Sequence, residues 1–235
     1  MLFFHYDIDM SEKQENFTLL NGHVIMKRSI YNPTSDAVWL AAYVPIKAKK
    51  ILDIGIGTGG ISLCLLYRNP TAQITGIDTS TNMLDACKIN MELNGRHINL
   101  VKADIKTWST TETFDLVVTN PPYFMGTPGN TGAHHTTDIS VWVKRSIARV
   151  KPQGYFCIIS DALTTDTIIS VLKTKHFGDI QIFPLFSKKH TAERVLIRAK
   201  LGVKTGASIY SGTNMNNESI LRSGLTIDEW LATLR

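Results

Sequence analysis

The stretch KILDIGIGTGG, residues 50–60, is an apolar run that leads directly into a cluster of glycines. Its first part, 50–55, has the β-branched and leucine content of a buried strand, and 58–68 continues as a predicted helix. Glycines at such a turn let a ligand approach main-chain amides, and the start of a helix attracts negative charge. The stretch therefore indicates the first βα turn of an α/β fold, with a ligand site at the turn.

Further strands and helices alternate after this unit, and the strands read as continuous apolar runs, as buried parallel strands do. The last two strands are joined by 187–191, which is too short for a crossover, so they must be antiparallel. We expect an α/β fold with a seven-stranded, mostly parallel sheet, an antiparallel last strand and helices on both faces. The expected strands are 50–55, 72–78, 98–104, 114–120, 154–160, 179–185 and 192–200, and the expected helices are 34–44, 58–68, 80–95, 140–150 and 163–175.

The chain of 235 residues suits one large domain with small additions. Residues 1–17 are expected to form a loose N-terminal arm. The domain is expected to span 18–204, and it includes a hairpin around Asn21-Gly22 and the helix 34–44. Residues 205–235 are expected to be a tail with one or two short helices that packs on the same domain.

Composition excludes several classes of protein. No apolar run reaches the roughly 18 residues of a membrane span, and the N-terminus lacks the pattern of a secretory signal, so we expect a cytoplasmic protein. The three cysteines stand apart in apolar patterns, and no metal-ligand spacing occurs. The net charge of +5 permits a polyanionic partner, although a solvated face explains it equally well.

The glycine run fits two templates. G-x-G-x-x-G, from Gly55, is typical of dinucleotide sites, whereas D-x-G-x-G-x-G, from Asp53, resembles the S-adenosylmethionine loop of class I methyltransferases. Asp53 favours the second, because a carboxylate suits the amino group of methionine and would repel a pyrophosphate.

Acidic residues also end the next two strands. Asp78 is placed to bind ribose hydroxyls, which fits either template, and Asp104 is placed to accept from an adenine amino group. We expect the cofactor to contact Asp53, Gly55, Gly57, Gly59, Asp78 and Asp104.

The strand 114–120 ends on Asn120-Pro121-Pro122-Tyr123, where two prolines prevent the sheet ladder from continuing. This corner falls beside the expected cofactor site. An aromatic amino or carboxamide nitrogen is a poor nucleophile, and two fixed acceptors on its hydrogens favour the attacking form. The Asn120 side-chain oxygen and the Pro121 carbonyl would be these acceptors, and Tyr123 would stack on a flat base, a contact that contributes about 1–3 kcal/mol. Asn120, Pro121 and Tyr123 are thus the expected catalytic residues.

This corner resembles the (N/D)PP(Y/F/W) motif of amino-methyltransferases. Over roughly 18–200, the chain resembles the bacterial tRNA(Val) adenine-N6-methyltransferases, which modify the adenine at position 37 of the anticodon loop. The segments that carry the resemblance are SDAVWLAAYV, NPPYF, Ala133-His134-His135 and RVLIRAK at 194–200, with ESILRSG at 218–224 in the tail. The resemblance implies a class I Rossmann-like fold, S-adenosylmethionine as methyl donor and tRNA as substrate.

A tRNA substrate needs contacts around the corner. The loop 124–138 is expected to meet it, and the basic stretches 144–151 and 188–204 would hold the phosphates. Local hydrogen bonding explains the two histidines of that loop equally well. The expected substrate-binding residues are Pro122, Phe124, His134, His135, Lys188 and Lys189. No obligate protein partner is inferred.

Other readings stay open. Protein-glutamine N5-methyltransferases also use NPPY but usually carry a sizeable helical N-terminal domain, and only 1–49 precede the first sheet strand here. Ribosomal RNA guanine-N2-methyltransferases often carry a duplicated half, which this chain lacks. A non-catalytic S-adenosylmethionine-binding module would usually lose the Asn120 corner, and no hydride-transfer residues support an NAD enzyme.

Overall fold

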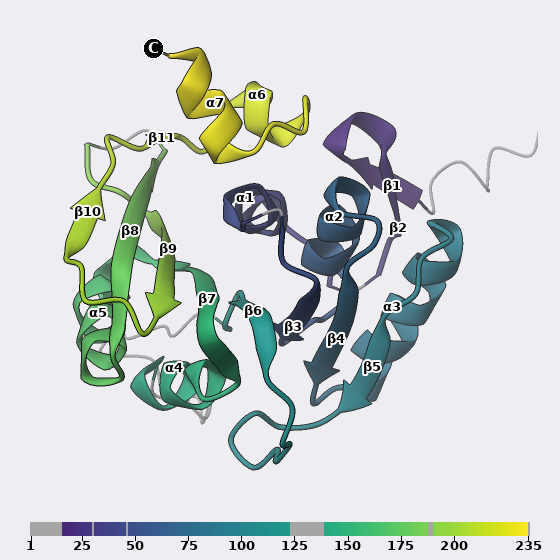
Figure 1. Ribbon diagram of the computed structural model, residues 1–235. Coiled ribbons are helices and arrows are strands. Elements are labelled where there is room, and N and C mark those ends of the chain that lie inside the picture. The colour runs from purple at the N-terminus through teal and green to yellow at the C-terminus, as the bar shows by residue number, and fades with distance from the viewer. Residues whose placement is uncertain (1–15, 30, 46, 123–138, 188–189, 235) are drawn as a thin grey trace, which may run out of the picture.

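The computed structural model describes residues 16–29, 31–45, 47–122, 139–187 and 190–234. Within this part of the chain, one nine-stranded sheet carries helices on both faces (Figure 1). Its strands are β3 (Lys50–Ile54), β4 (Gln73–Asp78), β5 (Asn99–Lys102), β6 (Phe114–Thr119), β7 (Val150–Asp161), β8 (Phe177–Phe186), β9 (Arg194–Leu201), β10 (Ala207–Ile209) and β11 (Thr213–Asn214). Their order is β10-β8-β9-β7-β6-β3-β4-β5, and β11 also pairs with β8.

All seven predicted strands are present, and β9 is antiparallel to both of its neighbours, β7 and β8, as predicted. The other pairs within the sheet are parallel. The sheet has nine strands and not seven, because β10 and β11 add to the outer edge of β8. These two short segments have no apolar run of their own. Pairing with a free sheet edge makes them strands, and that is not visible in their sequence.

The strand β7 begins earlier and the helix before it ends earlier than expected. Helix α4 (Ile139–Ile147) stops three residues before 150, and Val150 already pairs with Phe114 of β6. The register then shifts, so that Tyr155 faces Leu116, and Gln153 has a φ of 62°. The irregularity accommodates the proline at position 152, which the expected boundaries placed outside the strand.

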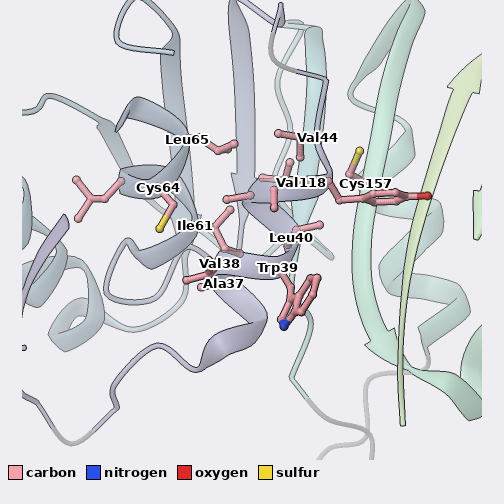
Figure 2. Close-up of a cluster of buried hydrophobic side chains, with 14 of the residues drawn as sticks. Ala37, Val38, Trp39, Leu40, Val44, Ile61, Cys64, Leu65, Val118 and Cys157 are labelled. Atoms are coloured by element: carbon pink, nitrogen blue, oxygen red, sulfur yellow. The ribbon is translucent and has the colours of Figure 1, made fainter. Parts of the chain in front are cut away.

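Each face of the sheet buries a different set of helices. Helices α1 (Ser35–Tyr43), α2 (Gly60–Arg68) and α3 (Thr81–Leu93) cover one face, and α4 and α5 (Thr165–Thr174) cover the other (Figure 1). Alternation along the strands produces this division, since Ile51 belongs to the first core cluster and Leu52 to the second. Figure 2 shows the apolar side chains of α1 and α2 gathered near Val118 and Cys157 of the sheet.

Helix α1 is buried on nearly every side, because the tail covers the surface that faces away from the sheet. Ile220 of α6 (Glu218–Leu221) and Ile227 of α7 (Ile227–Thr233) complete its core. The indole Nε1 of Trp39 donates a hydrogen bond to the Met215 carbonyl, 3.1 Å away. The tail therefore packs against α1 and contains two short helices, where the sequence predicted one or two.

A buried arginine fixes the tail to the sheet. Arg198 of β9 is only 8% exposed, and its guanidinium donates to both carboxylate oxygens of Asp228 in α7 at 3.1 and 3.2 Å. It also donates to the Tyr43 carbonyl and to the side-chain oxygen of Gln181. A two-pronged arginine–carboxylate pair with its other donors satisfied is a geometrically specific contact.

The predicted hairpin is present, and it starts before residue 18. Strands β1 (Asn16–Leu19) and β2 (Val24–Lys27) pair in antiparallel fashion around the turn Leu20–Gly22, so the boundary of the expected arm was too late. Residues 1–15 lie outside the described part of the chain. None of the described helices is long and apolar enough to cross a membrane.

Candidate active site

Two neighbouring hollows lie at the edge of the sheet where β3, β4, β5 and β6 end. The larger has a volume of about 570 Å³ and the smaller about 160 Å³. Among the described residues, Tyr31, Gly55, Met83 and Asn120 line both. The two hollows therefore adjoin at the glycine turn and at the end of β6, as expected for an open parallel sheet.

The glycine turn has a backbone that only glycine adopts readily. Gly55, Gly57 and Gly59 have φ values of 74°, 54° and 91°. Gly55 and Gly57 line the smaller hollow, whereas Gly59 lines neither. A Cβ on Gly59 would lie 2.7 Å from the sulfur of Cys87 in α3, so its small size serves helix packing. Of the three predicted glycines, the structure thus brings two to the cleft.

Asp78 lies at the end of β4 and lines the larger hollow. One carboxylate oxygen accepts from the Gly57 amide at 2.9 Å, and the other accepts from the Ser80 amide at 2.9 Å. These bonds fix the carboxylate and tie it to the glycine turn. Because each carboxylate oxygen can accept more than one hydrogen bond, Asp78 retains capacity for a ligand.

Asp104 lines the same hollow, two residues beyond the end of β5. Its Oδ1 accepts from the Lys106 amide at 2.9 Å, which orients the side chain in the turn. The structure therefore brings Asp78, Asp104 and the glycine turn together, as predicted.

Asp53 is placed differently from the other acids, because it is fully buried and lines neither hollow. Its Oδ2 accepts from the Ser62 hydroxyl at 2.7 Å, and its Oδ1 has no hydrogen-bond partner among the described residues. Burial raises the pKa of Asp53 to about 7; the Ser62 bond opposes this shift, and the charge of Asp78 adds to it. The structure therefore does not bring Asp53 to the cleft with the other predicted acids.

Asn120 follows the last residue of β6 and is one of the four described residues that line both hollows. Its Oδ1 is buried and finds no partner in the described part of the chain. A buried acceptor without a partner costs about 1–3 kcal/mol, and native proteins retain few of them. Pro121 is buried and Pro122 is exposed at the wall of the larger hollow. The corner therefore presents an unused acceptor at the point where the hollows meet.

Several of the predicted residues lie outside the described residues, and their roles stay predictions. They are Tyr123, Phe124, His134, His135, Lys188 and Lys189.

Some residues that line the cleft were not predicted. Tyr31 is 66% exposed and lines both hollows, and Trp142 of α4 lines the larger one. The helical spacing of the apolar residues in α4 could have indicated Trp142. The residues Ile139, Val143 and Ile147 form its buried stripe, and the indole lies on the flank of that stripe. Tyr31 gives no such signal, because it precedes α1 in an irregular segment.

Many of the basic residues expected to meet phosphate are engaged within the protein. Arg149 donates to the Trp108 carbonyl, Lys151 pairs with Asp115, and Arg194 pairs with Asp36 and Asp161. On α4, Lys144 and Arg145 are exposed and have no ion pair among the described residues. This narrows the candidate phosphate-binding surface within 144–151 to the exposed side of α4.

The strand order and the position of the cleft define a class I methyltransferase fold. A predicted O-methyltransferase from Agrobacterium tumefaciens superposes with a TM-score of 0.64 at 23% identity, over 77% of this chain and 88% of that one. A T. thermophilus 16S rRNA N2 G1207 methyltransferase superposes with a TM-score of 0.54 at 21% identity, over 76% of this chain and 47% of that one. The chain belongs to the methyltransferase small domain family, whose model matches residues 36–183.

Curated relatives carry the name tRNA1(Val) (adenine(37)-N6)-methyltransferase. One from a Flavobacteriaceae bacterium is 32% identical over 56% of this chain and 60% of its own length. Another, from Glaesserella parasuis, is 34% identical over 56% of this chain and 58% of its length. The Aeromonas hydrophila protein is 27% identical over 81% of this chain and 86% of its length. The first two matches thus span about three fifths of these relatives.

Proposed function

We propose that this protein transfers a methyl group from S-adenosylmethionine to N6 of an adenine in the anticodon loop of a tRNA. The observation that carries the proposal is the buried, unpartnered Oδ1 of Asn120 at the junction of the two hollows. The names of the relatives and the resemblance of the motifs support the choice of tRNA adenine.

The cleft suits the cofactor. The larger hollow falls in the usual size range for small-molecule sites and contains Asp78 and Asp104, which would hold the ribose hydroxyls and the adenine. The smaller hollow, lined by Gly55 and Gly57, would take the methionine part. S-adenosylmethionine supplies a methyl group on a sulfonium, which is already a strong electrophile.

The chain then has to position the acceptor. Asn120 Oδ1 and the Pro121 carbonyl would accept the two hydrogens of the exocyclic amino group, so that the nitrogen lone pair points at the methyl carbon. Positioning and preorganised acceptors are the main sources of rate here, and a strong base is not needed. The target base must leave its stack to reach this corner.

The exposed side of α4 would contact the RNA backbone. Lys144 and Arg145 follow Trp142, which lines the cleft, on the same helix. Phosphate contacts of this kind make binding weaken as salt rises, because bound counterions are released. A tRNA substrate also agrees with action in the cytoplasm.

Asp78→Ala is expected to weaken binding of S-adenosylmethionine by roughly 1.5–3 kcal/mol, the scale of hydrogen bonds to a charged group. The change removes the ribose acceptor and the anchor of the Gly57 amide together. Isothermal titration calorimetry measures the effect. Asp85→Ala is the matched control, because Asp85 is exposed on α3 and pairs only with Lys88 among the described ion pairs. Equal affinities of the Asp78 variant and the unmodified protein would rule out the ribose assignment.

Labelled S-adenosylmethionine tests the function itself. The protein is incubated separately with unmodified tRNA, ribosomal RNA and a release factor, and the products are digested. Label should enter tRNA and appear as N6-methyladenosine. Label in the release factor alone would favour a glutamine methyltransferase, and N2-methylguanosine in ribosomal RNA would favour the guanine enzyme. Either result contradicts the proposal.

A further inference from the structure

The indole of Trp142 is joined to the strand that carries the Asn120 corner. Its Nε1–H donates to the hydroxyl of Thr119 at 3.0 Å, and that hydroxyl donates to the Ile54 carbonyl at 2.8 Å. Thr119 is fully buried and immediately precedes Asn120. Ile54 is its partner in the parallel β3–β6 register and immediately precedes Gly55. The two hydrogen bonds therefore link α4, through Thr119 of β6, to the end of β3, where the glycine turn begins.

The indole ring also packs on the glycine turn. A Cβ built on Gly55 would lie 3.6 Å from Cζ2 of Trp142, so the ring lies in van der Waals range of the turn at this position. Trp142 is half-buried and lines the larger hollow. The same residue thus contacts both groups whose separation matters for transfer, the glycine turn and the strand end with Asn120.

We propose that Trp142 is a positioning residue that fixes the distance between the Asn120 corner and the glycine turn. The inference rests on the proposed function, in which Asn120 holds the acceptor. A threonine hydroxyl has one donor, and here it is committed to Ile54, so the indole N–H occupies an acceptor site and locks the rotamer of Thr119. With Thr119 locked, the backbone that leads into Asn120 has little freedom, and small displacements at this point reduce the rate of transfer strongly.

Two changes remove the bond from opposite ends. Trp142→Phe keeps a ring on Gly55 and removes the donor, and Thr119→Val keeps the shape and removes the hydroxyl. Each should lower kcat at least about 3- to 10-fold, the range of one net hydrogen bond. Cofactor Kd should stay within about twofold. In a Thr119→Val background, Trp142→Phe should cause little further loss, since the two groups share the bond. Thr119→Ser keeps the hydroxyl and should restore most of the activity.

Trp230→Phe is the control. Trp230 lies on α7, edge-on to Phe183 and away from the cleft, so the change should leave kcat unaffected. Additive losses in the Trp142 and Thr119 variants would overturn the proposal, as would a loss that appears only in cofactor affinity.

Nuclear magnetic resonance separates this inference from the proposed function, because it needs no RNA. The side-chain amide signal of Asn120 should shift or broaden in Trp142→Phe and in Thr119→Val, but not in Trp230→Phe. If the unmodified protein methylates no tRNA while this signal responds, the proposed function fails and the positioning role stands. If tRNA is methylated and neither the signal nor kcat responds, the positioning role fails.

Discussion

Asn120→Ala should lower kcat for methyl transfer by about 10²–10³-fold, the loss typical of removing one preorganised hydrogen-bonding group from an active site. The variant removes the buried Oδ1 that has no partner among the described residues, so folding loses little. S-adenosylmethionine affinity should stay within about threefold. Single-turnover transfer to tRNA gives the rate, and calorimetry gives the affinity.

Asn216→Ala is the control for this change. Asn216 is an exposed tail residue whose backbone N–H donates to the side-chain oxygen of Asn214, a bond that alanine keeps, so the change should leave the rate and the affinity unaltered. A fall in cofactor affinity as large as the fall in rate would show that Asn120 binds the cofactor and not the acceptor.

Asp53→Asn should stabilise the free protein above pH 7 and weaken its binding of S-adenosylmethionine. The pKa of Asp53 is about 7 in the folded state against an ordinary value of 3.8. The folded protein therefore binds more protons between about pH 4 and pH 7, and its free energy of unfolding falls as pH rises through this range. At about 1.4 kcal/mol per pKa unit, the charged form costs up to about 4 kcal/mol. The uncharged amide avoids this cost.

Urea unfolding from pH 5 to pH 8 measures the effect, and Asp85→Asn, an exposed change on α3, should follow the unmodified protein. The unmodified protein should lose stability as pH rises, and the Asp53 variant should lose less. Identical pH profiles would show that Asp53 is not neutral when buried. Asp53 lines neither hollow, so its charge would attract the methionine amino group only at longer range, and calorimetry at pH 8 measures the loss of affinity.

The sequence predicted the parts of this site that depend on strand ends. Strands buried on both faces leave continuous apolar runs, and the residues just after each run lie at a common edge of the sheet, which located Gly55, Asp78, Asp104 and Asn120. Asp53 shows the limit of this reasoning. Strand alternation predicts which face of the sheet carries the Asp53 side chain. It does not predict that this side chain bonds to Ser62 of α2 and is buried away from the cleft.

Residues that reach the cleft from other elements could not be placed in the same way. Trp142 meets Thr119 only because α4 packs against the sheet at one particular rotation.

The pattern of basic residues was also a weak guide to the phosphate-binding surface, because the sequence does not show which cations are already paired within the protein. Arg149, Lys151 and Arg194 are examples.

The pairing of β10 and β11 with β8 has a consequence for the solubility of shortened chains. A protein that stopped at Leu201 would leave β8 as a ten-residue edge strand with free amides and carbonyls on one side, and it would uncover the apolar surface of α1. Long, apolar edges of this kind recruit strands from other molecules. Self-association into aggregates is the expected behaviour of such a truncated chain, even though every strand and loop of the cleft would still be encoded in it.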